Sequence, residues 1–330
     1  MSAMTNAPAT IAATTMTKQA CIFGGTGFIG RQIVGALARE GYRIKVVTRA
    51  PESAYFLKTA GNPGQIAAVP FYRGDDATLR EAVAGCDVVV NCIGILAERG
   101  KSGFTRLHTE LPRAIAKACV AEKAGRFIHL SAIACDLNHS KYGKSKRNGE
   151  LAIFENFPAA TILRPAVVFG ADDNFFNLFA RMAQIMPFLP LIGGGKTRFQ
   201  PVYAGDVAKA VTACLRRPES KGAIYELGGP EILDFRALYE RLFLYTGRKR
   251  ALVSLPWGFA KFQGALMNLL LPDPPLTPDQ VESLKTNAVC SGDWPGLQDL
   301  GITATPLDAV LPSYLSRFRP GGRFAAKKKA

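Results

Sequence analysis

Short apolar runs alternate with stretches of helical spacing along the first half of the chain. Apolar residues dominate residues 19–23 and 43–48, and each run has the length of a strand. The run at 87–94 is almost wholly apolar, which is typical of a central parallel strand buried on both faces. Apolar residues recur with helical spacing at 31–40 and again at about 105–124. Strands that alternate with helices in this way predict an α/β fold with a doubly wound parallel sheet.

A glycine-rich turn joins the first predicted strand to the first predicted helix. Glycine suits such a turn because a side chain would forbid some of its backbone angles and would keep a pyrophosphate away from the free N–H groups at the helix start. The spacing is GxxGxxG, a weak signal alone, but its place between strand and helix favours a dinucleotide site over a turn that binds nothing. The residues expected to contact the cofactor are Gly24, Thr26, Gly27, Phe28, Ile29 and Gly30.

Charged residues after the next two strands bear on the choice of dinucleotide. Arg49 follows the second predicted strand, where an acidic residue would accept from a ribose 2′-hydroxyl and an arginine would pair with a 2′-phosphate. It predicts NADP(H), with NAD(H) as the alternative if Arg49 is only a solvated charge. Asp75 and its neighbour Asp76 follow the third predicted strand, at 66–73, and are counted as cofactor-site residues. Asp75 is placed to accept from the adenine amino group, to cap the next helix, or to do both.

Tyr142 and Lys146 are four residues apart, so that on a helix they project from one face. A phenol has a pKa near ~10 and acts as an acid or base at neutral pH only when a neighbouring ammonium stabilises its phenolate. Lys146 is placed to do this and to hold the nicotinamide ribose, although the same spacing also occurs in surface pairs. The buried run at 87–94 ends at Ile93 and Gly94, on the sheet edge where ligands bind. This context favours the functional interpretation.

The composition is that of a soluble globular protein and argues against metal chemistry. Hydrophobic residues make up 48% and charged residues 20% of the chain, and no run of eighteen apolar residues predicts a membrane span. The seven cysteines are scattered without a CxxC pair, as expected of buried, reduced thiols. The three histidines are too few and too badly spaced for a metal site. One of them, His129, lies in an apolar run and is predicted to be packed rather than catalytic.

Positive charge is concentrated towards the end of the chain. Lysine and arginine number 41 against 26 acidic residues, and residues 317–329 carry six basic residues and no acidic one. No nucleic-acid motif accompanies them, so the sequence predicts contact with an anionic membrane surface or a partner protein. The apolar stretch 257–271 is too short to span a bilayer and is predicted to lie on a membrane, against a partner helix, or in the core of a small lobe. Residues 1–17 lack signal and transit features and are predicted to be a disordered tail in the compartment of synthesis.

Together these residues resemble the extended short-chain dehydrogenase/reductase superfamily. The resemblance rests on Gly24, Gly27, Gly30, Asp75, Ser131, Tyr142, Lys146 and the run Arg164-Pro165-Ala166-Val167-Val168-Phe169-Gly170. It implies a Rossmann domain at 18–165, a smaller interleaved C-terminal lobe at 166–315 that closes over the cofactor, and a basic tail at 316–330. It also implies cofactor contacts at Pro165 and Val168.

Three later segments are similar to the family of dehydrogenase-like accessory subunits of respiratory complex I. They are residues 172–177, 193–208 and 295–307, and the similarity extends over about 18–315. It implies a peripheral protein on the cytoplasmic side of the energy-transducing inner membrane. Its partners there would be complex I subunits at the junction of the peripheral and membrane arms, near the quinone site. The family also implies that NADPH is held and not turned over.

One departure from the enzymes of the superfamily concerns catalysis. Their catalytic Ser or Thr usually lies about two residues beyond the position of Ser131, and here that residue is Ile133. Ser131 is then expected to contact cofactor or substrate at most, and Tyr142 and Lys146 to be retained for binding. Two alternatives use the same residues: an active NADPH-dependent reductase or epimerase, for example on a quinone-pathway intermediate, and a sensor of the NADP(H) ratio.

Overall fold

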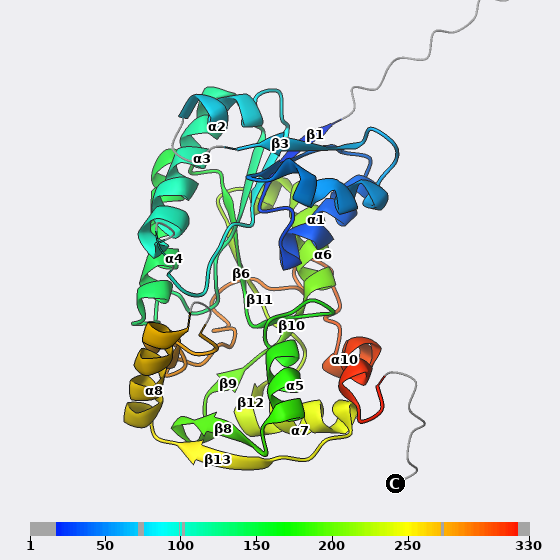
Figure 1. Cartoon of the computed structure of the whole chain (residues 1–330). Coiled ribbons are helices and arrows are strands. Elements are labelled where there is room, and N and C mark those ends of the chain that lie inside the picture. The colour runs from blue at the N-terminus through cyan, green and yellow to red at the C-terminus, as the bar shows by residue number, and fades with distance from the viewer. Residues whose placement is uncertain (1–17, 72–75, 99, 101–102, 272–273, 323–330) are drawn as a thin grey trace, which may run out of the picture.

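A seven-stranded parallel sheet forms the centre of the larger part of the molecule (Figure 1). The computed structural model describes residues 18–71, 76–98, 100, 103–271 and 274–322. The strand order is β11-β6-β5-β4-β1-β2-β3, and every neighbouring pair is parallel. The strands of this sheet are β1 Gln19–Phe23, β2 Arg43–Thr48, β3 Ile66–Pro70, β4 Val88–Asn91, β5 Arg126–Leu130, β6 Thr161–Pro165 and β11 Ile224–Leu227. The expected doubly wound sheet is therefore confirmed.

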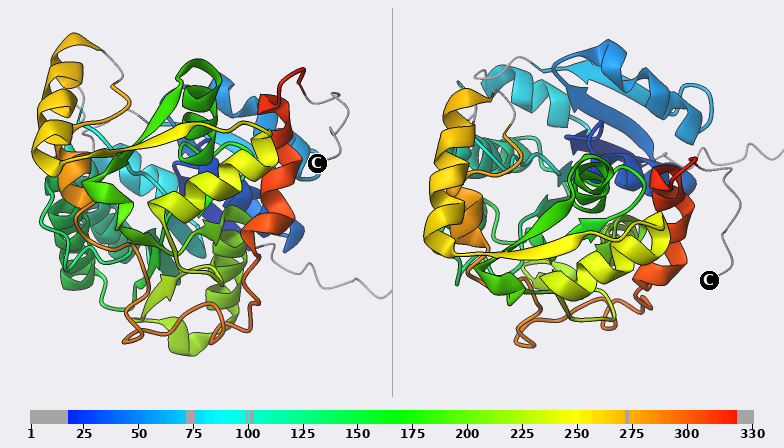
Figure 2. Two further views of the ribbon diagram at one scale, coloured as in Figure 1. Left: turned by 90° about the horizontal axis from the view of Figure 1, so that it is seen from below. Right: turned by 60° about the horizontal axis from the view of Figure 1, so that its bottom comes forward.

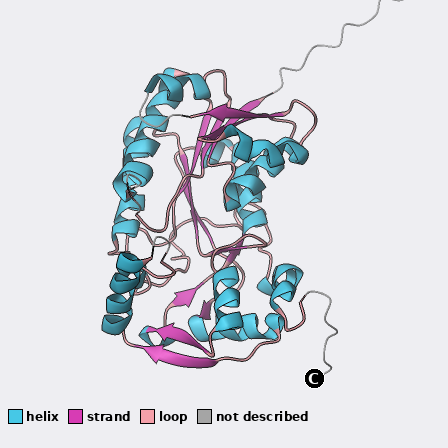
Figure 3. Ribbon diagram, in the orientation of Figure 1, coloured by secondary structure: helices cyan, strands magenta, loops and turns pink. Residues whose placement is uncertain are grey.

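Helices cover both faces of this sheet (Figure 3). Helices α1 and α6 lie on one face, and α2, α3 and α4 lie on the other (Figure 1). Their bounds are α1 Phe28–Arg39, α2 Asp76–Val83, α3 Leu111–Ala121, α4 Lys141–Asn156 and α6 Ala204–Arg216, with the 3₁₀ segment η1 Pro51–Ala60 beside α1. In β1, Ala20 and Ile22 pack towards α1 whereas Cys21 and Phe23 pack towards α2 and α3. Because side chains alternate along a strand, a sheet covered on both faces needs apolar residues at every position.

The described residues of the smaller lobe form three two-stranded sheets and five α-helices below the main sheet (Figure 1), and Figure 2 shows this lobe from its own side. The paired strands are β7 Val168–Phe169 with β10 Val202–Tyr203, β9 Arg198–Phe199 with β12 Leu233–Asp234, and β8 Phe188–Ile192 with β13 Ala251–Leu255. The helices are α5 Phe176–Ile185, α7 Phe235–Thr246, α8 Trp257–Leu270, α9 Pro278–Ser283 and α10 Leu307–Leu315. Aromatic rings fill the core, with Phe179 lying 5.1 Å from Phe175 and 5.7 Å from Phe235 between centroids.

The helix expected at about 105–124 is divided in two. A π-helical turn at Thr105–Glu110 (η2) precedes α3. Pro112 explains the change, because it has no N–H to donate to the carbonyl of His108 four residues earlier. π-Helical turns are rare and often lie at functional sites.

Helix α8 exposes its apolar side chains. Only Ala260 and Gly264 of this helix are buried, whereas Phe262 is 67% and Leu269 82% exposed. The interpretation of this stretch as a core helix of the lobe is therefore wrong. The views of Figures 1 and 2 place α8 at the outer edge of the molecule. Among the residues that the structure describes, no helix is both long and apolar enough to cross a membrane.

The start of the predicted basic tail belongs to the lobe. Arg317 donates to the Asn177 side-chain oxygen at 2.8 Å, and Arg319 Nε donates to the Tyr245 carbonyl at 3.0 Å. These two guanidinium groups are therefore engaged within the chain. The rest of the predicted tail, from residue 323 onward, lies outside the described residues.

Candidate functional site

The glycine-rich turn lies where the strand order reverses, between β1 and β4. Gly24 has a φ of +77°, and a Cβ on it would lie 3.1 Å from the backbone of Ile93. A Cβ on Gly30 would lie 2.1 Å from the Gly24 carbonyl oxygen, which no real structure tolerates. Only glycine therefore fits at these two positions, and the turn and the end of β4 form one continuous edge, as in dinucleotide-binding sheets.

The start of α1 is available to an anion. Gly27 is the N-cap and provides no side chain, and the first turn of the helix contains no acidic residue. The N–H groups of Phe28, Ile29 and Gly30 therefore have no acceptor inside the helix, and the helix dipole adds positive potential there. This donor set and the space left by the glycines fit a pyrophosphate.

The C-terminal lobe reaches the rim of this turn. Arg31 on α1 pairs with Asp172, in the loop after β7, at 2.9 Å, and its other nitrogen donates to the Thr26 carbonyl at 3.3 Å. Pro165 ends β6 in the interior, and Val168 begins β7 on the way to this loop. The predicted residues Thr26, Pro165 and Val168 thus belong to the same end of the sheet.

The structure describes only some of the residues predicted to bind the adenosine end of the cofactor. Arg49 directly follows β2 and is exposed, as expected for a residue that meets a 2′-phosphate. Asp76 is the exposed first residue of α2. Asp75 lies outside the described residues, so its predicted contact with adenine and its predicted capping role stay predictions.

Tyr142 and Lys146 lie one turn apart at the start of α4. Ser140 caps this helix by accepting from the Gly143 N–H at 3.0 Å. Asp279 of α9 adds a second cap from the other lobe, because its carboxylate accepts from the backbone N–H of Tyr142 at 3.1 Å. Lys146 is buried, donates to the Leu130 carbonyl at 2.7 Å, and would lie 3.9 Å from a Cβ on Gly94.

The expected activation of the phenol by Lys146 stays a prediction, which this arrangement does not favour. Desolvation raises the pKa of Tyr142, and Lys146 directs its ammonium at the Leu130 carbonyl instead of the phenol. Desolvation also lowers the pKa of Lys146 to about 8. The Tyr142 phenol therefore stays protonated at neutral pH, while the Lys146 ammonium loses its proton at a pH just above neutral.

Lys146 should make the protein more stable as the pH rises from about 8 to 10. Its folded-state pKa of about 8 lies below the usual lysine value of 10.5, so that across this window the unfolded chain binds a proton that the folded chain does not. Stability then rises by about 1.4 kcal/mol per pH unit. Urea unfolding at pH 7.5, 8.5 and 9.5 should show this rise in wild type and in Lys144→Met, an exposed neighbour on the same helix. Lys146→Met should lack it, and an equal rise in Lys146→Met would contradict the assignment.

The residue at the position of the superfamily's usual catalytic Ser or Thr is the apolar Ile133. Ile133 is buried, and its N–H donates to the Pro165 carbonyl at 3.0 Å. Ser131 is buried behind it, with Oγ 3.9 Å from Cys135 Sγ. His129 is fully buried with Nδ1 3.1 Å from the Asn91 amide, which confirms that it is a packed residue.

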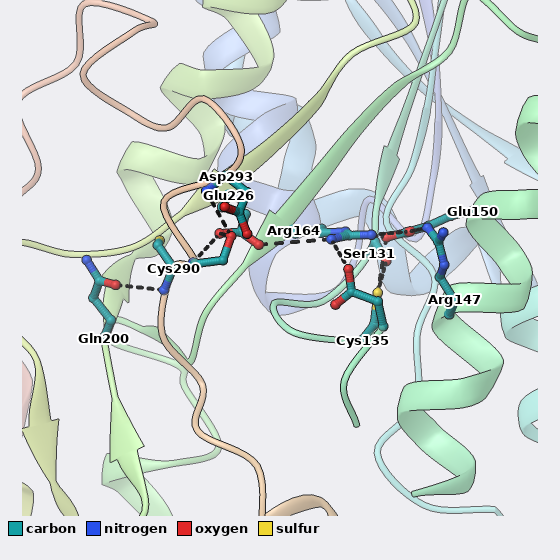
Figure 4. A network of polar contacts seen from close by, with 11 residues as sticks. Ser131, Cys135, Arg147, Glu150, Arg164, Gln200, Glu226, Cys290 and Asp293 are labelled. Atoms are coloured by element: carbon teal, nitrogen blue, oxygen red, sulfur yellow. Dashed lines mark hydrogen bonds and ion pairs between the residues drawn. The ribbon is translucent and has the colours of Figure 1, made fainter. Parts of the chain in front are cut away.

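A buried ion pair next to Ser131 was not predicted from the sequence (Figure 4). Arg164 of β6 donates to both carboxylate oxygens of Glu150 on α4, at 2.9 and 2.8 Å, and to Asp136 at 3.0 Å. Arg164 and Glu150 are fully buried. Glu226 of β11 lies 3.9 Å from Arg164 and accepts from the Ser291 hydroxyl at 3.0 Å. The network therefore connects α4, the central sheet and the late segment that crosses it.

His108 was also missed. Its ring lies in the π-helical turn, fully buried, with Nε2 accepting from the Ile95 N–H at 3.0 Å and Nδ1 2.8 Å from Ser145 Oγ. The signal in the sequence was a polar residue between Leu107 and Leu111, on the apolar face of a predicted helix. A buried polar side chain of this kind needs a partner, and here the partners belong to the site.

Comparison with known proteins agrees with the fold. Residues 20–228 match the NAD dependent epimerase/dehydratase family. The "NADH dehydrogenase [ubiquinone] 1 alpha subcomplex subunit 9, mitochondrial" of Mus musculus is 34% identical over 303 residues, covering 91% of this chain and 80% of that protein. The protein of the same name from Arabidopsis thaliana is 33% identical over 317 residues, covering 92% and 78%.

Two further similarities are more distant. A "Ceramide reductase" of Caulobacter vibrioides is 31% identical over 198 residues, which is 60% of this chain and 61% of that protein. The crystal structure of an NADPH-dependent quinone oxidoreductase from Escherichia coli in complex with NADPH superposes with a TM-score of 0.71 at 20% identity, over 90% of this chain and 98% of that chain. At such identity the superposition shows the fold alone. The chain therefore belongs to the NAD dependent epimerase/dehydratase family and, within it, to the group of the complex I alpha subcomplex subunit 9 proteins.

Proposed function

We propose that this protein is an NADP(H)-binding accessory subunit of respiratory complex I that holds its cofactor without turning it over. The similarity to subunit 9 proteins over nine-tenths of the chain carries the subunit role. The glycine turn and the uncapped start of α1 support cofactor binding. Within the complex the protein would lie at the junction of the peripheral and membrane arms, near the quinone site, on the cytoplasmic side of the inner membrane.

The residues of the site fit a protein that binds its cofactor better than one that turns the cofactor over. A bound nicotinamide supplies hydride chemistry, which in this fold needs a group that stabilises charge on the reacting oxygen. Ile133 supplies no hydroxyl there, and desolvation, by raising the pKa of Tyr142, disfavours the phenolate that oxidation of an alcohol would need. The start of α1 would bind the pyrophosphate and Lys146 would contact the nicotinamide ribose.

Co-purification tests the subunit role. Membranes that contain a tagged, full-length chain are solubilised in mild detergent and purified through the tag. The expected result is that NADH:quinone oxidoreductase activity elutes with the chain, together with about one NADPH per chain in an acid-free extract. If the chain elutes alone while complex I stays intact in the flow-through, the proposal is wrong.

Two observations favour an active reductase as the second candidate. Tyr142 and Lys146 are both present and one helical turn apart beside Gly94, and a partial relative is called a ceramide reductase. NADPH oxidation with quinones and long-chain ketones as substrates separates the two candidates. Turnover that disappears in Tyr142→Phe would support the reductase.

Arg49→Ala should weaken NADPH binding by more than tenfold and leave NADH binding unchanged. A charge-assisted hydrogen bond to the 2′-phosphate contributes about 1.5–3 kcal/mol, and NADH has no such group. Calorimetric titration of both cofactors measures the difference. Arg43→Ala, an exposed arginine at the opposite end of β2, is the matched control and should change neither affinity. Equal affinity of wild type for NADPH and NADH would contradict the assignment of Arg49.

The lower surface of the lobe supports the proposed contact with an anionic membrane. It comprises residues 185–198 and 247–271, which include the paired strands β8 and β13 and helix α8. These segments contain six lysines and arginines and no acidic residue. They also carry exposed large apolar side chains, among them Ile185 and Phe188 besides those of α8. Lys261 of α8 is paired with Glu282 of α9 at 3.8 Å, and the other five basic residues of these segments have no acidic partner within the two segments. Apolar side chains among an excess of positive charge suit the interface of an anionic bilayer.

Introducing charge on α8 should abolish binding to anionic vesicles. Phe262→Asp/Leu269→Asp places two carboxylates on the most exposed part of the helix. Each replaces an apolar contact by repulsion, so that co-sedimentation with phosphatidylglycerol vesicles should fall by more than tenfold. Val120→Asp, an exposed apolar position on α3, is the matched control and should bind as wild type does. Unchanged sedimentation of the double variant would contradict the membrane contact.

A further inference from the structure

His108 occupies its place because the backbone around it is irregular. The π-helical turn at Thr105–Glu110 brings its side chain inward between the end of β4 and α4. Gly149 of α4 allows this approach, since a Cβ on that residue would lie 1.9 Å from the His108 carbonyl oxygen. The π-helical turn, which is a rare form, and Gly149, which permits close contact, thus both allow His108 to take this position.

Hydrogen bonds fix the imidazole in one tautomer. Nε2 faces the Ile95 N–H at 3.0 Å and can only accept from it. Nδ1 therefore carries the proton and donates to Ser145 Oγ at 2.8 Å, while the Ser145 hydroxyl donates to the Tyr142 carbonyl at 2.7 Å. The loop after β4 is in this way joined to the first turn of α4.

The same ring borders the residues at the nicotinamide end. It meets the Tyr142 ring edge to face at 5.5 Å between centroids, and Phe104 stacks on it at 5.4 Å. A Cβ on Gly94 would lie 3.8 Å from His108 Nε2 and 3.9 Å from Lys146 Nζ. His108 therefore lies beside Gly94, Tyr142 and Lys146, although no motif of the sequence includes it.

We propose that His108 is a positioning residue of the nicotinamide half of the cofactor site, which ties the loop Ile93–Ile95 to the Tyr142 end of α4. The inference rests on the proposed binding of NADP(H). A ligand that contacts both elements binds more tightly when their spacing is fixed beforehand, because less freedom is lost on binding. His108 acts through the neighbouring residues and does not itself touch the cofactor.

The imidazole serves as a neutral clamp and not as an acid or base. Desolvation and the neighbouring Lys146 lower the pKa of His108 to about 3. Protonation of Nε2 would place a donor against the Ile95 N–H and break that bond. Glutamine is the conservative replacement, because its side-chain oxygen can reach the position of Nε2 and accept from the Ile95 N–H without titrating.

Binding measurements with a whole and a half cofactor test the proposal. His108→Ala should weaken NADPH by about tenfold and leave 2′,5′-ADP, which lacks the nicotinamide half, unchanged. His108→Gln should restore part of the NADPH affinity. Thr109→Val is the matched control, because Thr109 donates from the same turn to the Ser145 carbonyl at 3.2 Å but does not reach the loop after β4. It should bind both ligands as wild type does.

A second measurement does not depend on the cofactor. Hydrogen exchange of the Ile95 amide in the free protein should be at least tenfold faster in His108→Ala than in wild type, and slow again in His108→Gln. Equal exchange in wild type and His108→Ala would overturn the inference, as would an equal loss of NADPH and 2′,5′-ADP affinity in His108→Ala. A wild-type protein that binds neither ligand would instead overturn the proposed function, and the inference about the nicotinamide half with it.

Discussion

Replacing Gly30 with alanine should abolish cofactor binding. The new Cβ would lie 2.1 Å from the Gly24 carbonyl oxygen, a backbone atom that can move only if the whole glycine turn moves. Overpacking of this kind destabilises by about 1–3 kcal/mol, and the displaced turn no longer presents its N–H groups to a pyrophosphate. We expect no NADPH binding by calorimetry at concentrations about a hundredfold above the wild-type Kd, and a lowered urea midpoint.

Gly35→Ala is the matched control on the same helix. A Cβ there would lie 3.5 Å from an Arg39 side-chain nitrogen, which is an ordinary contact. Alanine is favoured over glycine inside a helix by about 0.5–1 kcal/mol, so this variant should be at least as stable as wild type and should bind NADPH normally. Normal NADPH binding by Gly30→Ala would show that the turn is not the pyrophosphate site.

Arg164→Met should cause the largest loss of stability among the substitutions considered. It leaves the Glu150 carboxylate fully buried without its two strongest donors. Removing one partner of a buried ion pair costs about 3–5 kcal/mol, which is a large share of the stability of a typical domain. Urea unfolding at neutral pH measures the loss. Arg80→Met breaks an exposed pair with Glu122 at 2.9 Å and should cost no more than about 1 kcal/mol.

A double variant and the pH dependence of stability distinguish the effect of lost charge pairing from that of lost packing. Arg164→Met/Glu150→Met should recover part of the loss, since the buried carboxylate, which in Arg164→Met keeps only Arg147 at 3.1 Å as a cation partner, is then gone. Burial raises the pKa of Glu150, but the hydrogen bonds from Arg164 outweigh it and hold this pKa below its usual value. In Arg164→Met the pKa should rise, so that the deficit relative to wild type should shrink as the pH falls towards about 4. A deficit that is independent of pH and remains in the double variant would indicate lost packing instead.

Local patterns in the sequence predict the nucleotide-binding half well. The strands expected at 19–23 and 43–48 match β1 and β2 residue for residue. A strand buried on both faces appears in the sequence as a continuous apolar run. A turn that binds a pyrophosphate needs glycines at fixed spacing. Both features can therefore be recognised from consecutive residues. The spacing of Tyr142 and Lys146 on one helical face is local for the same reason.

The remaining features depend on contacts between distant segments. Three contacts of the site form only once the chain has folded: Ile95 with His108, Asp279 with Tyr142, and Arg164 with Glu226. The sequence around each of these residues does not indicate which residue it contacts. The exposure of α8 was likewise open, because an apolar helix has the same composition in a core and on a surface. Apolar spacing predicted one regular helix at 105–124. Such spacing does not reveal how Pro112 changes the turn before it.

The position of β11 has a consequence for the synthesis of the chain. Strand β6 ends at Pro165, but its neighbour β11, which ends at Leu227, follows about 60 residues later, after the chain has passed through the lobe. At about 5–20 residues per second, a ribosome needs on the order of 3–12 seconds to make this segment. During that time β6 is an open edge, and such edges pair with other chains. The first 165 residues made alone would keep that edge permanently, so the nucleotide-binding half should aggregate when expressed without the segment that supplies its last strand.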